Sequence, residues 1–161
     1  MRRAFFYTVL TLFILAGPSV TSKAGEAVEA NDSVHGDPSH HVALFLGATV
    51  SDDEAAFSVG VDYEYELTEL LGIGAIAEYT AGHHATWVLA GALFLHATEA
   101  LRFKIAPGVE FEDGEESFLL RLGASYEFEL AERWTIGPDL NVDIVDGEAA
   151  LVVGIGIGRK F

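Results

Sequence analysis

Cysteine is absent from this sequence, and basic residues are scarce in it. Without cysteine, the chain has no disulfide framework, no thiolate metal site and no cysteine nucleophile. Nine Lys and Arg stand against 25 Asp and Glu, which gives a formal net charge of -16. So acidic a protein repels nucleic acid, and we therefore expect no nucleic-acid partner.

Long apolar runs are also missing, apart from one near the N-terminus. Two arginines precede an apolar run over 4–16, and small residues follow near position 24. The run ends at Gly17 and Pro18, short of the roughly 20 apolar residues of a membrane-spanning helix. This layout is typical of a secretory signal peptide. We therefore predict a signal peptide over 1–24 that is removed on export.

The segment 25–40 is small, polar and acidic and has no apolar period, so we predict a flexible periplasmic leader there. Histidines lie in this segment and just after it, but their spacing matches no standard metal site. We therefore expect no metal and no cofactor. The histidines to which the sequence assigns no role are His35, His40, His41, His83 and His84.

Beyond position 40 no helical period of useful length appears, whereas apolar and polar residues alternate in segments of about ten. In the clearest case Phe57, Val59 and Val61 alternate with Ser58 and Gly60. Because successive side chains of a strand point to opposite faces, each segment has one oily and one polar face. The predicted strands are 41–51, 55–67, 70–80, 84–97, 101–112, 117–130, 134–145 and 148–161.

Short links of two alternating kinds separate these segments. One kind holds Thr-Glu or Ala-Glu, and the other is acidic or glycine-rich. Asp-Gly at 113–114 and at 146–147 is a strong signal for a tight hairpin. Links this short join antiparallel neighbours. The sequence therefore predicts an all-β fold, an eight-stranded antiparallel up-and-down barrel with short turns on both sides. Pro107 and Pro138 each remove a donor from the ladder, so we predict local bulges there.

Two architectures share this meander: a soluble lipocalin-like barrel with an apolar interior and a transmembrane barrel with an apolar exterior. The polar face is rich in glycine, alanine and serine, which suits the narrow lumen of eight strands. Aromatic residues of the oily face gather at both strand ends, as in the girdles of membrane barrels. We therefore predict a transmembrane barrel. The girdle residues are Phe57, Tyr63, Tyr65, Tyr79, Trp87, Phe103, Phe111, Phe118, Tyr126, Phe128, Trp134 and Phe161.

On this interpretation the polar face lines the lumen, where ten acids outnumber four bases. Buried carboxylates must be paired, protonated or hydrated. We therefore expect water or cations in part of the lumen. A solvated plug of salt bridges and a narrow cation-preferring pore both fit. The predicted lumen charge network is Asp62, Glu64, Glu78, Arg102, Lys104, Glu110, Arg121, Glu127, Asp139 and Asp143.

The sequence shows no nucleophile with an adjacent base on its outward face. We therefore predict no catalytic residue and no enzymatic activity. The outer links are only a few residues long, whereas an adhesin or receptor usually carries long loops. The main prediction is a structural membrane barrel with an acidic lumen, and the alternatives are the cation channel and the soluble ligand-binding barrel.

The final strand resembles the C-terminal strand of the small outer membrane β-barrel proteins, the OmpA-type family, and the resemblance covers 41–161. The residues that carry it are Val153, Ile155, Ile157 and Phe161. In that family the barrel assembly machinery reads the terminal aromatic, which the resemblance implies for Phe161. Arg159 departs from the apolar residue that is usual third from the end. The resemblance also implies an outer membrane location with lipid and lipopolysaccharide as partners, and we expect a monomer.

Overall fold

The computed structural model describes residues 39–51, 54–82 and 85–161. The predicted signal peptide and all of the predicted leader except Ser39 and His40 lie outside these residues. No helix within them is long and apolar enough to cross a membrane. Their strands are β1 (His40–Ser51), β2 (Glu54–Glu66), β3 (Leu71–Thr80), β4 (Thr86–His96), β5 (Leu101–Glu112), β6 (Glu115–Tyr126), β7 (Phe128–Ala131), β8 (Trp134–Val145) and β9 (Glu148–Lys160).

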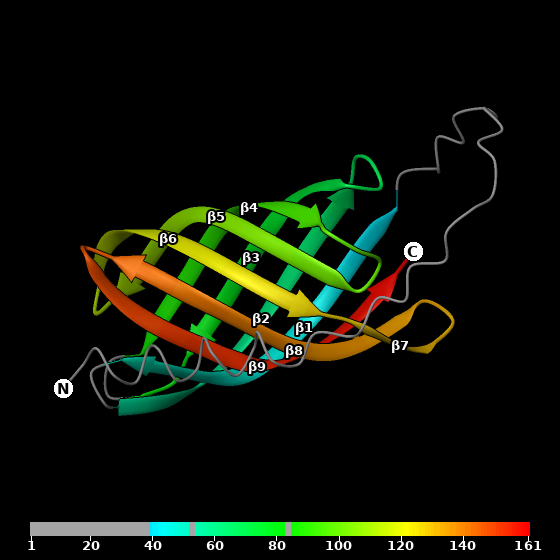
Figure 1. Ribbon diagram of the computed structural model, residues 1–161. Coiled ribbons are helices and arrows are strands. Elements are labelled where there is room, and N and C mark those ends of the chain that lie inside the picture. The colour runs from blue at the N-terminus through cyan, green and yellow to red at the C-terminus, as the bar shows by residue number, and fades with distance from the viewer. Residues whose placement is uncertain (1–38, 52–53, 83–84) are drawn as a thin grey trace, which may run out of the picture. The chain divides into compact units, whose positions relative to one another are not determined.

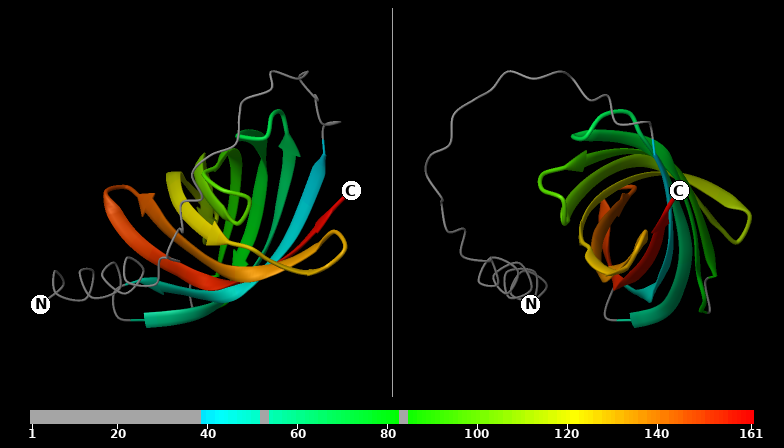
Figure 2. Two further views of the ribbon diagram at one scale, coloured as in Figure 1. Left: turned by 45° about the vertical axis from the view of Figure 1, so that its right-hand side comes forward. Right: turned by 90° about the vertical axis from the view of Figure 1, so that its right-hand side faces the viewer.

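These strands form one antiparallel sheet that closes on itself (Figure 1). Each strand from β1 to β5 pairs with the next one along the chain, and β8 pairs with β9. Closure comes from the pairing of β1 with β9, in which Leu44 faces Ile157. Both β6 and β7 pair with β8, so they form a single wall that is interrupted at Glu127. The fold is therefore the predicted eight-stranded up-and-down barrel, and a view along it shows the closed ring of strands (Figure 2).

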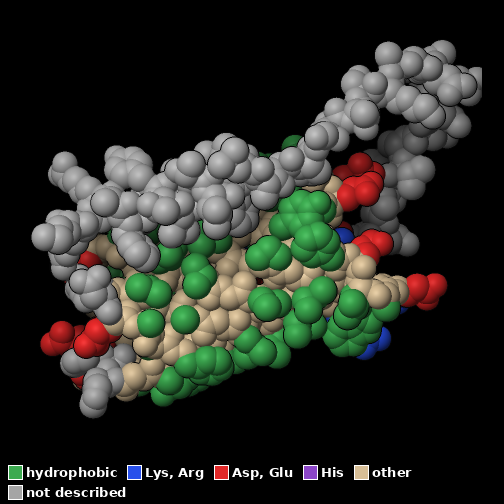
Figure 3. Space-filling view, turned by 60° about the horizontal axis from the view of Figure 1, so that its bottom comes forward, with side chains coloured by type: hydrophobic (Ala, Val, Ile, Leu, Met, Phe, Trp, Pro, Cys, Tyr) green, Lys and Arg blue, Asp and Glu red, His purple; other side chains and the backbone are tan. Residues whose placement is uncertain are grey.

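The oily faces of the strands point outward. Along β1, His41 and Phe45 are buried, whereas Leu44 and Leu46 are about 40% exposed. Figure 3 shows one side of the molecule, where hydrophobic side chains spread over the strands and acidic side chains gather at the two ends. A soluble lipocalin-like barrel needs the opposite arrangement, with its apolar face inside. The barrel therefore lacks the apolar interior that the lipocalin-like alternative requires.

The links between strands follow the two kinds seen in the sequence. Asp113-Gly114 and Asp146-Gly147 are two-residue turns in which both central residues have positive φ, between 49° and 88°. This is the type I′ geometry that Asp-Gly favours, because glycine adopts positive φ without steric cost. At the opposite end, the Thr68 and Thr98 hydroxyl oxygens each accept two backbone N–H bonds. The two Thr-Glu turns are therefore alike in structure as well as in sequence, because the threonine hydroxyl makes the same hydrogen bonds in both.

The predicted bulges at the two prolines are wrong. On the two sides of Pro107, Ala90 faces Gly108 and Leu93 faces Ile105, so the register of β4 and β5 is unchanged. Pro138 likewise faces Ile155 in an unbroken β8–β9 ladder. Each proline lacks only one N–H, and the strand passes it without an inserted residue.

A register shift occurs elsewhere, in the β7–β8 hairpin between Glu129 and Ala131. Arg133, in the turn of this hairpin, has φ of 69°, an unusual conformation for a residue with a side chain. The backbone N–H of Glu127 donates to the carbonyl of Ala100 at 2.8 Å. Beyond that bond, β7 pairs only with β8, so one edge of β7 is not paired to any described strand.

Part of the lumen is apolar. The inward residues of β4 include Val88 and Phe94, which are 2% and 0% exposed. Phe94 belongs to a buried cluster with alanines of β4 and β5 and with Ile76 of β3. Val88 and Phe94 therefore mark the inward face of β4, although both sides of this strand are apolar in sequence. This layer fills the lumen between the charged side chains described below.

Two facing glycines make room for an aromatic ring inside the barrel. Gly47 of β1 faces Gly154 of β9 across the closing seam. A Cβ atom added to either glycine would lie within 2.6 Å of the Phe45 ring. Small residues at these positions therefore let Phe45 lie across the seam.

Candidate functional site

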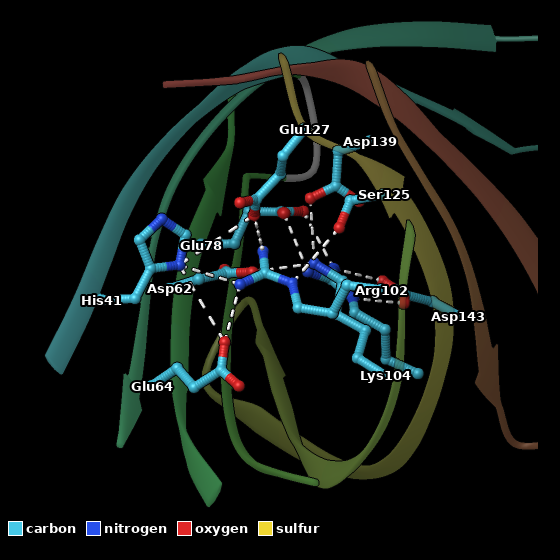
Figure 4. A network of polar contacts seen from close by, with 11 residues as sticks. His41, Asp62, Glu64, Glu78, Arg102, Lys104, Ser125, Glu127, Asp139 and Asp143 are labelled. Carbon is cyan, nitrogen blue, oxygen red and sulfur yellow. Dashed lines mark hydrogen bonds and ion pairs between the residues drawn. The ribbon is translucent and has the colours of Figure 1, made fainter. Parts of the chain in front are cut away.

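Three basic side chains from neighbouring strands project into the lumen. Arg102 and Lys104 lie on β5 with one residue between them, so both point to the same face, and Arg121 lies on the adjacent β6. All three are at most 5% exposed. Figure 4 shows Arg102 and Lys104 directed toward carboxylates that come from other walls of the barrel. Each of the three bases binds two acids.

Arg121 joins three walls. Its Nη1 and Nη2 donate to the two oxygens of Glu78 on β3 at 2.9 and 3.0 Å. Its Nε and Nη2 donate to Asp143 on β8, both at 2.6 Å. Two bidentate contacts satisfy the planar guanidinium fork and orient it rigidly. Glu78 and Asp143 are each 3% exposed, so the whole group is withdrawn from bulk water.

Lys104 binds one carboxylate on each side. Its Nζ lies 2.8 Å from Asp62 Oδ2 on β2 and 3.0 Å from Asp139 Oδ2 on β8. The other oxygen of Asp139, Oδ1, is buried and has no hydrogen-bond partner among the described residues, and the same holds for Asn141 Oδ1. An unpaired buried acceptor costs about 1–3 kcal/mol unless a water molecule binds it.

Arg102 is the centre of the third group. Its Nη1 lies 2.7 Å from Glu64 Oε2, and its Nη2 lies 3.1 Å from Glu127 Oε1. Two histidines complete this group: His41 Nδ1 lies 2.9 Å from Arg102 Nη1, and His96 Nε2 lies 2.6 Å from Glu64 Oε1. Because Arg102 is a donor, His41 Nδ1 is the acceptor of that bond.

The three groups are rich in negative charge and leave little open space. They contain six carboxylates and three Lys or Arg side chains. A cavity of about 10 Å³ borders Asp62, Asp139 and Glu127. That volume holds about one water molecule. The surplus carboxylates therefore share a lumen that is nearly filled by side chains.

Nine of the ten residues predicted for the lumen charge network are brought together in these groups. Glu110 is the exception: it is only partly buried and forms no ion pair or hydrogen bond with another described residue. Outside the predicted network, Glu66 and Lys160 form a further ion pair, 3.7 Å apart, near the ends of β2 and β9.

The charge network predicted from the sequence omits the two histidines that belong to it, although His96 was expected to point inward. His41 is 2% exposed and His96 is 15% exposed on its side chain. Their inward position on alternating strands was the available signal, because Ala43 and Phe94 share their faces. His40 points the other way, and its Nδ1 lies 2.9 Å from the Tyr63 hydroxyl. His35, His83 and His84 lie outside the described residues.

The aromatic residues assigned to the girdles lie on the outward face, near the two ends. At one end the register places Tyr79 opposite Trp87 and Trp87 opposite Phe111. The rings of Tyr79 and Trp87 are 5.0 Å apart. At the other end Tyr126 and Phe128 are 4.9 Å apart. The girdle residues that are more than a third exposed are Phe57, Tyr63, Trp87, Phe103, Phe118, Phe128, Trp134 and Phe161.

One threonine hydroxyl lies beside a histidine in the lumen: Thr135 Oγ1 and His41 Nε2 are 3.5 Å apart. Both residues are buried. The other nitrogen of His41 faces Arg102 rather than a carboxylate that would orient a base. Among residues 39–51, 54–82 and 85–161, no group of three or more His, Asp or Glu has the geometry of a metal site.

No protein-family model and no curated protein matches this chain. Solved structures do resemble it. The N-terminal β-barrel domain of Pseudomonas aeruginosa OprF is 15% identical with a TM-score of 0.60, and the match covers 76% of this chain and 97% of that one. The outer membrane protein OprG from the same organism is 10% identical with a TM-score of 0.55, over 77% and 96%.

A third similar structure is that of the Yersinia pestis outer membrane protein Ail in a phospholipid bilayer nanodisc. It is 12% identical with a TM-score of 0.55, and the match covers 78% of this chain and all of that one. At these identities the likeness concerns the fold. The closed antiparallel barrel seen here is the fold of these outer membrane proteins.

Proposed function

We propose that this chain is an outer membrane protein whose barrel spans the bilayer and whose lumen is closed by a plug of paired charges. The outward apolar face supports the location, because hydrocarbon solvates it whereas water does not. Closure of the sheet by the β1–β9 ladder supports it too, since neighbouring strands pair their backbone groups without help from solvent. In this role the protein is structural.

The observation that carries the closed plug is the bracing of opposite walls by Arg102, Lys104 and Arg121. Each base binds at least one carboxylate from a strand that is not its sheet neighbour, as Arg121 on β6 binds Glu78 on β3. The apolar layer around Phe94 fills space beside them. Passage of a hydrated ion would require several of these buried pairs to separate, at a cost of several kcal/mol each.

A second candidate is a narrow cation-preferring channel. The observation that favours it is the surplus of carboxylates over bases in the lumen, since rings of carboxylates select cations. The small cavity beside Asp139 gives such a path one hydrated position. We give this candidate second place because the neighbouring space is filled.

The proposal includes an orientation and a set of partners. The signal peptide over 1–24 would direct export of the chain. Both termini of the barrel would then lie in the periplasm, because an even number of strands returns the chain to the side on which it started. The Asp-Gly turns would then face outward toward lipopolysaccharide. Phe161 would serve as the signal to the barrel assembly machinery. A closed sheet with few free edges supports a monomer, and the buried Thr135–His41 pair supports the absence of an enzymatic role.

Recordings of conductance in planar bilayers test this proposal. The protein is extracted from outer membranes, its folding is checked by the shift between unboiled and boiled bands on a gel, and a general porin serves as the positive control. The closed plug predicts no conductance above that of the lipid alone. Cation-selective steps from correctly folded protein would establish the channel instead, and recovery of the protein wholly in the soluble periplasm would contradict the membrane location.

A further inference from the structure

Basic residues are distributed in an unusual way on this acidic barrel. After the predicted signal peptide only six remain in the sequence. Three of them, Arg102, Lys104 and Arg121, are buried in the lumen. The other three, Arg133, Arg159 and Lys160, lie together at one place, which we name the basic corner. The backbone N–H of Lys160 donates to the carbonyl of Arg133 at 2.8 Å, which brings the two segments side by side.

Arg159 is the residue of this corner that is built to receive a ligand. It lies on the outward face of β9, in line with Ile155 and Ile157, at the end of the apolar strip. Its guanidinium carbon is 5.3 Å from the Trp134 ring centre and 4.9 Å from the Phe161 ring centre. Both rings contact the guanidinium by cation–π interaction, and Arg159 is exposed.

No acid among the described residues neutralises Arg159. It forms no ion pair with them, and neither does Arg133. Lys160 does have a partner, Glu66, at 3.7 Å. Glu132 lies next to Arg133 in the turn without binding it, and the C-terminal carboxylate lies two residues beyond Arg159 without an ion pair to it. The exposed guanidinium of Arg159 is therefore available to an anion from outside the chain.

We propose that Arg159, held between Trp134 and Phe161, binds the phosphate of an anionic phospholipid headgroup in the leaflet on the side of the chain termini. The proposal rests on the membrane location proposed above. Exposed tryptophan and terminal phenylalanine mark the depth at which headgroups lie. The arginine fork matches phosphate geometry. The acidic remainder of the surface repels anionic lipid, so binding is confined to this corner.

Quenching of tryptophan fluorescence by brominated lipid tests the site, because the sequence has only two tryptophans. Trp87→Phe leaves Trp134 as the reporter, and its ring centre lies 5.3 Å from the guanidinium carbon of Arg159. The full chain, folded in phosphatidylcholine vesicles, receives equal mole fractions of either brominated phosphatidylglycerol or brominated phosphatidylcholine. We expect Trp134 to prefer phosphatidylglycerol by about fivefold, the effect of one arginine at an anionic surface.

Variants distinguish binding at Arg159 between Trp134 and Phe161, here called the clamp, from the general attraction of anionic lipid to positive charge. Arg159→Gln should reduce the preference to roughly one, and Arg159→Lys should retain part of it through charge alone. Arg133→Gln, which removes an equal charge from the same corner but not from the clamp, should keep most of the preference. Equal quenching by both lipids in the parent protein, or a preference that survives Arg159→Gln, would overturn the proposal.

The experiment also distinguishes two other cases: a site for soluble phosphate, and a barrel that does not lie in the bilayer. Excess soluble glycerol phosphate should leave the preference unchanged, and displacement of the lipid would assign the site to soluble phosphates instead. If neither brominated lipid quenches Trp134, the barrel is not in the bilayer, and the proposed membrane location fails together with this site. Quenching by both lipids without preference leaves the membrane location intact and removes only the headgroup site.

Discussion

Arg121 and Glu78 face each other across the lumen and form a bidentate ion pair with N–O distances of 2.9 and 3.0 Å. Arg121 also holds Asp143, and all three residues are nearly inaccessible to water. Removal of one partner of a buried ion pair leaves an uncompensated charge. The free energy lost to that charge exceeds the net stabilisation that the intact pair provides.

Arg121→Met is therefore expected to lower the free energy of unfolding by about 3–5 kcal/mol, since it leaves two buried carboxylates without a cation. Urea titration of the protein in lipid vesicles, followed by the loss of the fast-migrating unboiled band, measures this change. Arg133→Gln is the control, because Arg133 is exposed and has no ion pair with the described residues. Equal stability of the two variants would show that the lumen network does not stabilise the barrel.

Substitution of Lys104 should lower the stability of the barrel more than substitution of Asp139. Lys104→Met strips the cation from Asp62 and Asp139 together and is expected to cost about 3–5 kcal/mol. Asp139→Asn leaves the Lys104–Asp62 contact in place, reduces the surplus of negative charge and should cost about 1 kcal/mol or less. Urea midpoints measured side by side test this order. The reverse order would mean that Asp139 is the essential member of its group.

Gly47 should tolerate no side chain. An added Cβ atom would collide with the carbonyl oxygen of Val153 and lie 2.5 Å from the Phe45 ring, and backbone cannot move aside cheaply. Gly47→Ala is therefore expected to lose about 1–3 kcal/mol of stability through overpacking. Gly91→Ala is the matched control on an outward position, where an added Cβ meets no atom within 4 Å. Similar midpoints for the two variants would refute the close packing at this seam.

Deletion of Phe161 should reduce outer membrane insertion while export continues, if the terminal aromatic is read during assembly. Fractionation of cells and the heat-modifiable band shift give the inserted fraction. Phe118→Ala is the control, since Phe118 is a similarly exposed aromatic at the opposite end of the barrel. Insertion that is undiminished by the deletion would remove the assembly role from Phe161.

The barrel was predictable because a two-residue alternation assigns every side chain to a face without knowledge of its neighbours. The inward position of Arg121 and Asp143, and the tight turn at Asp113-Gly114, follow from local sequence in this way. The pairing of Arg121 with Glu78 does not, because β3 and β6 are not neighbours in the sheet. Their contact depends on the stagger of strands around the barrel, which no local pattern encodes.

Other differences have similar causes. Glu110 has the correct parity but lies near the end of β5 opposite to the end that carries Arg102 and Lys104. The interruption at Glu127 lies near Pro138 of β8, where a missing N–H ends the ladder between these walls. The sequence shows the position of the proline. It does not show whether the proline causes a bulge or a gap in strand pairing.

The backbone N–H of Phe161 donates to the carbonyl of His40 at 2.8 Å, so the last residue of the barrel touches its first strand. The order of strands is therefore cyclic, and the point at which the chain begins is not fixed by the architecture. A circular permutant that joins Phe161 to His40 and opens the chain at Asp113-Gly114 would keep every ladder of the sheet. In such a molecule Phe161 would pack as it does now but would no longer be the C-terminal residue. The permutant therefore distinguishes the effect of its packing from the effect of its terminal position.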